Sequence, residues 1–234
     1  MKKGLAELHT EPFTAEREWA VEGIPVLTAS VSLPQPVGEE GGVSRRIRRY
    51  YRLQCRAFLR YCELFLLPWA AEAYRAALAA SAPLPCFRAE LSYRVTYNQG
   101  GLWSLYTQSR EVTVPGQTLV TRRGDTWDLG TGYPAAPAAF FQPRTPWKRR
   151  LLAAAAAEIQ RQEAAGTARY REDWRRRLRR AFNPQNFYLT DQGLVFFFPM
   201  YALAPAVEGV PAFLLPYGSE GLRQLAPEGE APAP

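Results

Sequence analysis

The sequence predicts an α+β protein in which long helices pack on one face of a mostly antiparallel sheet. Three observations lead to this prediction. Residues 87–97 alternate between apolar and polar side chains, residues 43–79 carry an apolar stripe with helical spacing, and strand-like aromatic segments follow residue 186. The predicted order is a strand, a long helix, a strand meander, two helices and a final group of strands.

The N-terminal part of the chain predicts an arm, a strand and a long helix. Residues 1–20 lack the apolar segment of a secretory signal, and we expect them to form an arm. Residues 24–35 alternate in polarity between prolines, which indicates a strand. The helix begins near Val43, and Pro68 is expected to kink or interrupt it. Its apolar stripe comprises Ile47, Tyr51, Cys55, Phe58, Cys62, Phe65 and Trp69.

The middle of the chain predicts an antiparallel meander. Residues 87–97, FRAELSYRVTY, place apolar side chains on one face and polar side chains on the other. The NQGG segment after them is a hairpin turn signal. Residues 102–114 and 118–129 continue the meander as two more strands, with a turn at Pro115–Gln117 between them. One face of the meander is polar, so it meets water or a partner.

The C-terminal part predicts two helices and a return to strands. Thr145 is a plausible N-cap, with Pro146 at the first helical position and Gly166 near the end of the first helix. Residues 168–182 form the second helix, with an apolar stripe of Tyr170, Trp174, Leu178 and Phe182. Strands at 186–190 and 194–198 flank a tight turn, a last strand covers 212–217, and residues 223–234 are expected to be disordered.

The net charge of +7 is concentrated in one segment. Residues 148–180 hold eleven basic and four acidic side chains, so the rest of the chain is neutral overall. A local basic face suits nucleic acid, anionic lipid or an acidic protein, although most charged helix faces are simply solvated. Two sets of arginines form the candidate basic surface: Arg45, Arg49, Arg52, Arg56 and Arg60 on the long helix, and Arg175, Arg176 and Arg179 further along.

The three cysteines do not suggest a disulfide scaffold. Cys55 and Cys62 share the predicted long helix, where seven residues separate them by roughly 10 Å, too far for a disulfide bond. With Cys86 the count is odd, and no spaced framework exists. Buried free thiols in a reducing compartment are the simpler interpretation.

A longer motif lies between Phe187 and Tyr217, and it resembles a known family. The order is a Phe-Tyr-Leu-Thr strand, an acidic-Gly turn, an aromatic strand, a Tyr-x-Leu-Ala-Pro segment, a glycine and a final Pro-Tyr. This order resembles the RsiV-like family, a domain of unknown function found in an anti-sigma factor and beside a peptidoglycan deacetylase. The residues that carry the motif are Phe187, Tyr188, Asp191, Gly193, Phe197, Tyr201, Ala204, Pro205, Gly209, Pro216 and Tyr217.

The resemblance extends upstream and implies a domain organisation. Residues 93–108 resemble the hairpin of the family, and residues 21–86 resemble its companion strand–helix subdomain. Residues 87–222 would then form the RsiV-like α+β domain, unless 21–222 is one continuous fold. The chain departs from the family where Val112–Gln117 replaces a Gly-Gly-Ala-His segment. Relatives are usually extracytoplasmic, whereas this sequence shows neither a signal peptide nor a transmembrane helix, so we expect it to be cytoplasmic.

Three function classes follow from these observations. The resemblance implies a non-catalytic recognition or sensing module with a protein or glycan ligand, since the family's anti-sigma factor captures lysozyme. It implies no cofactor. The alternative is a binder of nucleic acid or another anionic partner through the arginine-rich helices. In both cases the motif residues of the C-terminal strands are interpreted mainly as core packing.

An enzyme is the least favoured class. The chain has one histidine, His9, which falls in the expected arm, and it lacks a Cys-x-x-Cys spacing and a phosphate-binding loop. We therefore predict no catalytic, metal or cofactor residues. The remaining route to catalysis is a carboxylate pair, with Glu90 and Glu111 across the first hairpin as the example.

Overall fold

The computed structural model describes residues 7–38, 41–114 and 117–225. These residues divide into two compact units. We call residues 9–93 and 107–121 the long-helix unit, and residues 1–8, 94–106 and 122–234 the aromatic unit. The expected turn at Pro115–Gln117 lies mostly outside the described residues, as do most of the expected disordered tail and the first six residues of the arm.

One six-stranded sheet and one three-stranded sheet make up the strands of the fold. The larger sheet has the order β1-β2-β3-β4-β5-β6, from Thr10–Val21, Ile24–Pro36, Phe87–Gln99, Leu102–Val114, Gln117–Asp128 and Tyr133–Pro134. Its β1–β2 and β5–β6 pairs are antiparallel, and β2 pairs with β3 in parallel. The predicted α+β class with a mostly antiparallel sheet is therefore confirmed.

The expectation of an N-terminal arm over residues 1–20 was wrong for its second half. Thr10–Val21 is a strand, β1, which pairs with β2 along its whole length. Most of its side chains are exposed, because β1 is the edge strand of the sheet. The charged residues that made this segment look like an arm are the solvated side chains of that edge.

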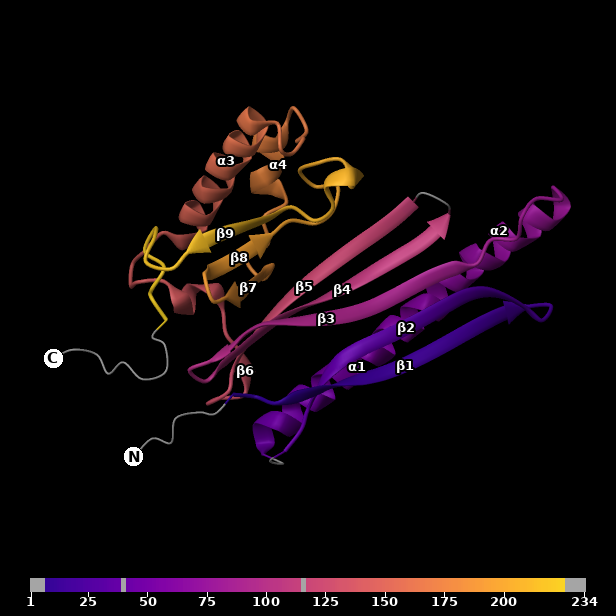
Figure 1. Ribbon diagram of the computed structural model, residues 1–234, viewed down its shortest axis with the longest axis horizontal. Coiled ribbons are helices and arrows are strands. Elements are labelled where there is room, and N and C mark those ends of the chain that lie inside the picture. Colours follow the sequence, from indigo (N-terminus) through magenta and orange to yellow (C-terminus); the bar gives the residue numbers. More distant parts are fainter. Residues whose placement is uncertain (1–6, 39–40, 115–116, 226–234) are drawn as a thin grey trace. The chain divides into compact units, whose positions relative to one another are not determined.

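In the long-helix unit, a continuous helix connects the parallel strands β2 and β3, as a parallel pair requires. It consists of α1 (Gly42–Tyr61), a π-helical turn (Cys62–Leu66) and α2 (Leu67–Ala79). Both α1 and α2 pack against β2, and Figure 1 shows them running along the strands of this unit. The buried face of β2 carries Leu27, Ala29, Val31 and Leu33.

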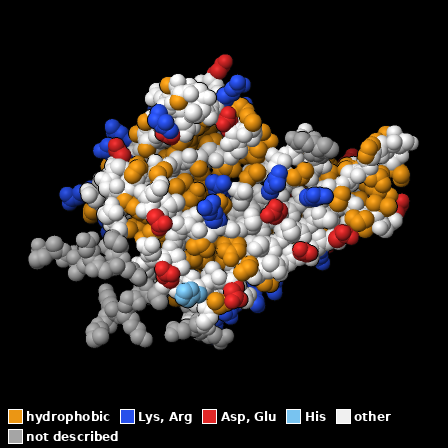
Figure 2. All heavy atoms as spheres, in the orientation of Figure 1, with side chains coloured by type: hydrophobic (Ala, Val, Ile, Leu, Met, Phe, Trp, Pro, Cys, Tyr) orange, Lys and Arg blue, Asp and Glu red, His pale blue; other side chains and the backbone are white. Residues whose placement is uncertain are grey.

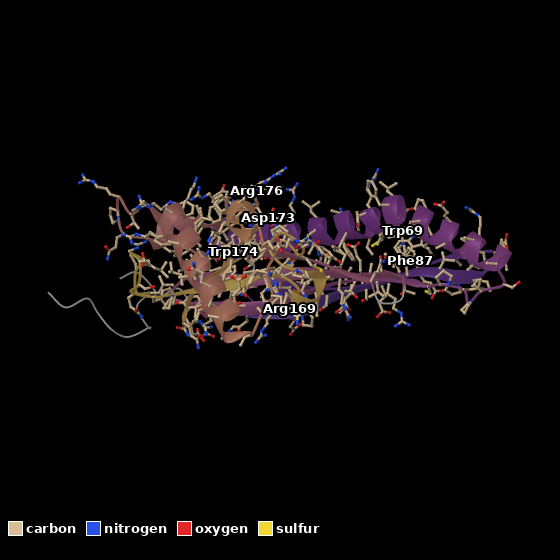
Figure 3. All side chains as sticks on the ribbon, turned by 90° about the horizontal axis from the view of Figure 1, so that it is seen from above. Trp69, Phe87, Arg169, Asp173, Trp174 and Arg176 are labelled. Carbon is tan, nitrogen blue, oxygen red and sulfur yellow. The ribbon has the colours of Figure 1, made fainter. Side chains whose placement is uncertain are left out.

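The π-helical turn changes which side chains of the long helix are buried. Pro68 cannot donate a backbone hydrogen bond, and the turn before it absorbs this defect without breaking the helix: the Leu67 amide donates to the Cys62 carbonyl. The wider turn shifts the stripe by one position, so Leu66 and Ala70 are buried instead of the predicted Phe65 and Trp69. Phe65 is 65% exposed. Trp69 is half exposed and makes an edge contact with Phe87 of β3 (Figure 3).

In the aromatic unit, two helices lie beside the three-stranded sheet (Figure 1). The elements are a 3-10 turn (Pro137–Phe140), α3 (Trp147–Ala165), α4 (Trp174–Arg180), β7 (Phe187–Thr190), β8 (Gly193–Phe197), a 3-10 turn (Ala206–Glu208) and β9 (Ala212–Pro216). The helix α3 packs against β9 and α4. Their shared core holds Leu151, Ile159, Trp174, Leu178, Phe187, Phe196, Phe198 and Phe213.

Three details of this unit differ from the sequence prediction. The last strands form a second sheet of their own, β7-β8-β9, whereas the sequence predicts a single sheet. Pro146 is the N-cap of α3, and Thr145 makes no side-chain cap hydrogen bond. The second helix is only seven residues long, although its predicted stripe is correct in placing Trp174 and Leu178 in the core. The predicted stop at Gly166 is confirmed by its left-handed backbone conformation.

Candidate recognition surfaces

A wide hollow of the long-helix unit lies on the sheet face that the long helix leaves open. Over residues 27–33 of β2 and 87–91 of β3 the odd-numbered side chains are buried beneath the helix, and the even-numbered side chains face outward. Paired positions place Glu18, Thr28 and Arg88 in one row, and Glu16, Ser30 and Glu90 in the next. The hollow measures about 1060 Å³, and its other lining residues are Arg17, Ala29, Ala89, Pro83–Cys86, Arg110, Val112 and Thr113.

Side chains of both signs face this hollow. The acids are Glu16, Glu18 and Glu90, and the bases are Arg88 and Arg110. Arg17 also borders the hollow, but it is paired with the buried Ala29, so its side chain lies on the helix-covered side. Figure 2 shows side chains of both signs interspersed over these strands. Arg17 also lies 3.7 Å from Glu63 and 5.5 Å from the Trp19 ring centre. A surface of this kind complements a ligand that carries both charges, whereas a polyanion would meet three carboxylates.

The carboxylate pair considered for catalysis is not assembled. Glu90 is exposed and lines the open hollow. Glu111 is buried on the opposite, helix-covered side, where it accepts a 3.0 Å hydrogen bond from the Tyr61 hydroxyl of α1. Two acids on opposite faces of a sheet cannot flank one glycosidic bond.

Glu111 instead belongs to a polar cluster between the long helix and β4. Burial raises the pKa of Glu111, and the Tyr61 hydrogen bond lowers it by less. Burial together with Glu111 raises the pKa of Tyr61 to about 12, and does the same for the Cys62 thiol. Nearby, Gln54 donates a 3.0 Å hydrogen bond to the Thr107 hydroxyl. The cluster is enclosed, so these groups have a structural role within the unit.

The structure shows three free cysteines. Cys55 and Cys62 are buried, as expected for the long helix, whereas Cys86 is exposed and lines the open hollow. The expectation of buried thiols is thus wrong for Cys86. His9 is exposed, and its backbone carbonyl accepts a hydrogen bond from Val37 beside the β1–β2 pair. Among the described residues, no group of three or more His, Cys, Asp or Glu side chains is arranged to hold a metal ion.

The residues of the C-terminal motif shape β7–β9 and their turns. Phe187, Tyr188, Phe197 and Ala204 are buried, and the exposed members are Asp191, Tyr201, Pro205 and Pro216. The Tyr217 hydroxyl donates to the Thr190 carbonyl across the β7–β8 turn, and burial raises its pKa. A side chain at Gly193 would come within 2.1 Å of the Leu215 carbonyl, and Gly209 adopts a positive φ of 68°. The motif therefore encodes close strand packing and turn geometry.

The predicted basic surface consists of two separate patches, one in each unit. On α1 the five arginines Arg45, Arg49, Arg52, Arg56 and Arg60 are all exposed. Four of them surround a shallow depression with Arg48 and Leu53. Arg52 also donates to the Gln35 side chain and lies 5.9 Å from the Phe13 ring centre. This patch is polar and lies along the outer side of one helix.

The second patch lies on α3 and α4 of the aromatic unit. Arg175, Arg176 and Arg179 are exposed, but they are not equivalent. Arg176 forms an ion pair with Asp173, whose pKa the hydrogen bonds from Arg177 and Arg176 lower (Figure 3). Arg175 and Arg179 line a groove of about 640 Å³ together with Lys148, Arg149, Leu152, Ala153, Ala156, Gln160, Trp174 and Leu178.

Sequence reasoning missed two parts of these surfaces. Glu16 and Glu18 were assigned to an arm, although their alternation with Ala15 and Arg17 is compatible with a strand. Lys148 and Arg149 were counted in the basic segment but not placed beside α4. On α3, Lys148, Leu152, Ala156 and Gln160 follow one another at four-residue spacing and so form one ridge of the helix. This spacing could have indicated which side chains share a surface.

The fold is that of a two-unit α+β protein with open, charged faces, and comparison relates part of it to a family. Residues 138–218 match the model of DUF3298, a family of proteins of unknown function. This segment is therefore similar to the domain of that family. It includes α3, α4 and β7–β9, and with them the whole motif between Phe187 and Tyr217.

Solved structures of DUF3298 proteins share the fold over nearly the whole chain. A family member from Bacteroides fragilis has a TM-score of 0.65 at 13% identity, and the match covers 92% of each chain. A family protein from Pseudomonas aeruginosa has a TM-score of 0.54 at 15% identity, over 89% of this chain and 90% of that chain. No curated protein matches the sequence. At these identities the likeness establishes the fold and assigns no residue a role.

Within the described residues, no helix combines the length and apolar character needed to cross a membrane.

Proposed function

We propose that this chain is a non-catalytic recognition module that binds a protein or glycan ligand through the open hollow of the long-helix unit. The observation that carries the proposal is the mixture of carboxylates (Glu16, Glu18, Glu90) and arginines (Arg88, Arg110) on that regular strand face. Regular strands hold such side chains in fixed positions, so the face needs little ordering on binding. The resemblance to the RsiV-like family, whose anti-sigma factor acts as a sensor, supports the same role.

A polypeptide is the ligand that the lining favours over a glycan. A protein segment carries hydrogen-bond donors, acceptors and charges of both signs. Its amides and basic side chains can bind Glu16 and Glu90, and its carbonyls and acidic side chains can bind Arg88 and Arg110. Among the described residues that line the hollow, none is aromatic and able to stack on a sugar. At about 1060 Å³ and open to solvent, the hollow also suits part of a polymer better than an enclosed small molecule.

The second candidate is a binder of nucleic acid or another anionic partner through the α1 arginine patch. The observation in its favour is that Arg45, Arg49, Arg52 and Arg56 surround one depression. Such binding weakens steeply with salt, because it releases counterions. A substitution in the hollow that leaves the charge unchanged would not weaken binding of nucleic acid to the α1 patch.

The test uses Ser30→Trp, which fills the floor of the hollow without changing the charge. Ser32→Trp is the matched control, since Ser32 lies on the same face of β2, two residues along, outside the hollow. The wild-type chain and both variants are immobilised and exposed to native-source lysate. They are then washed at low and at ~0.5 M salt, where surface electrostatics are largely screened.

We expect a discrete protein to remain on the wild-type chain and on Ser32→Trp in high salt, and to be lost from Ser30→Trp. Equal retention by both variants would contradict the assignment of the hollow. If only nucleic acid binds, elutes with salt and is lost from Arg45→Glu/Arg49→Glu, the α1 arginine patch is the functional surface and the proposal is wrong.

A further inference from the structure

The groove between α3 and α4 combines an apolar floor with a basic rim. The buried Trp174 and Leu178 of α4 and the half-buried Leu152 and Ala156 of α3 form the floor, with the exposed Ala153 beside them. The rim carries Lys148, Arg149, Arg175 and Arg179, and none of the described residues that line the groove is acidic.

The four rim cations have no acidic partner among the described residues, whereas several cations near them do. Close by, Arg161 pairs with Glu158, and Arg176 and Arg177 pair with Asp173 at 2.6–2.7 Å. In the part of the chain that the structure describes, Lys148, Arg149, Arg175 and Arg179 make no ion pair. Two of them contact aromatic rings: Arg175 lies 4.4 Å from the Trp174 ring centre and Lys148 lies 5.4 Å from that of Trp147. Glu158 and Asp173 thus pair with Arg161, Arg176 and Arg177 beside the groove but not with the cations on its rim.

We propose that this groove binds an acidic amphipathic helix of a partner protein. Lys148, Leu152, Ala156 and Gln160 stand four residues apart on α3, so they form a straight row roughly 18 Å long. An apolar stripe of a partner helix would contact the floor, where the alanines allow close approach. Its acidic flanks would contact the rim cations on both sides. This site is in the aromatic unit, so the proposal is independent of the hollow in the long-helix unit.

The floor argues against nucleic acid and against a membrane surface as the occupant. Single-stranded nucleic acid needs exposed rings on which bases stack, and Trp174 is 2% exposed with Arg175 over it. An anionic membrane is met by cations beside protruding apolar side chains, whereas the apolar side chains here are recessed between two helices. A narrow recessed floor with a cationic rim matches an amphipathic helix.

The experiment uses a fluorescent 18-residue helical peptide with leucines in one stripe and glutamates on its flanks. A peptide of the same composition but scrambled order is the control for charge alone. Binding to the full chain is measured by fluorescence anisotropy at about 0.15 M salt. A single-stranded oligonucleotide and vesicles containing phosphatidylserine are titrated in parallel.

Two variants test the groove. Ala153→Trp blocks it without changing the charge, at an exposed position where folding is not at risk. Arg175→Glu/Arg179→Glu reverses one side of the rim. Its control, Arg45→Glu/Arg49→Glu, makes the same charge change at the same four-residue spacing on α1, and circular dichroism checks that each variant folds.

We expect the amphipathic peptide to bind at least about tenfold more tightly than the scrambled peptide, and both groove variants to weaken it about tenfold or more. Arg45→Glu/Arg49→Glu should change its affinity by less than about threefold. Equal affinity for the two peptides would show that binding depends on charge alone, and would overturn the proposal. An equal loss of peptide affinity in the two double variants would have the same meaning. Tighter binding of the oligonucleotide or the vesicles, weakened by the groove variants, would overturn it in favour of that occupant.

Discussion

The two units each cover a sheet with a helix, but they bury different chemistry in doing so. In the aromatic unit, Leu151, Ala155 and Ile159 of α3 share a core with phenylalanines from β7 to β9, and the side chains of that core are apolar and aromatic. In the long-helix unit, the interface with β4 holds Glu111 and Thr107, which meet Tyr61 and Gln54 of α1.

The two helix–sheet interfaces therefore contribute differently to the free energy of unfolding. A packed aromatic core gains both hydrophobic burial and favourable ring geometry, as between Phe196 and Phe213 at 5.7 Å. A buried carboxylate with one hydrogen bond loses hydration that the bond only partly replaces. Within the described residues, the Gln54 Oε1 atom is also buried without a hydrogen-bond partner. Replacing the buried Glu111 by an uncharged side chain is therefore expected to stabilise the long-helix unit.

The substitution with the largest expected effect on the free energy of unfolding lies in the aromatic unit. Phe213→Ala removes a ring that contacts Phe196 and Phe198 and is 2% exposed. It should lower the free energy of unfolding by about 4 kcal/mol, because the packed surroundings cannot collapse into the cavity. Urea denaturation followed by circular dichroism measures the loss. A loss below about 1 kcal/mol would mean that this core is loosely packed.

The next effect tests the π-helical turn of the long helix. Leu66 is 3% exposed and Phe65 is 65% exposed, although the sequence pattern predicts the reverse assignment. Leu66→Ala should cost about 3 kcal/mol and Phe65→Ala less than about 0.5 kcal/mol in urea denaturation. If Phe65→Ala proves the costlier change, the helix continues past Cys62 without the wide turn.

These two residues also show how far the sequence can predict the structure. Hydrophobic periodicity correctly predicts the long helix, the strand at 87–97 and the Trp174–Leu178 stripe, since each depends on local spacing. It does not predict the burial of Leu66, because one extra residue in a turn leaves no mark on composition and shifts every later position. The strand β1 was missed for a related reason: the charges of a solvated edge strand resemble those of an arm.

The candidate surfaces depend on long-range pairing, which the sequence does not display. The polar face of residues 87–97 was predicted, and with it Arg88 and Glu90. Which strands extend that face was unknown until the parallel β2–β3 register placed Ser30 beside Glu90. The Glu90–Glu111 pair failed because directly opposed residues of a hairpin share a face, whereas these two lie on opposite faces and so are not opposed.

The smallest expected effect concerns Glu111 and has a defined pH dependence. Burial raises the pKa of Glu111 in the folded chain above its ordinary value of 4.5, so the folded state holds this proton more tightly than the unfolded state. Its contribution to stability is therefore fully present at low pH and is lost as the pH rises through the raised pKa. At neutral pH an ionised Glu111 opposes folding.

Glu111→Gln should therefore raise the free energy of unfolding by about 1 kcal/mol at pH 7, because the amide oxygen still accepts from Tyr61 and no charge is buried. The gain should shrink as the pH falls toward 4.5, where the wild-type carboxyl is itself protonated in the folded chain. Urea denaturation from pH 4 to pH 8 measures the trend, with Glu90→Gln on the exposed face as the control that should change little. If Glu111→Gln destabilises the chain most at pH 7, the ionised carboxylate is a net stabilising partner of Tyr61, and the contrast between the two helix–sheet interfaces is one of packing alone.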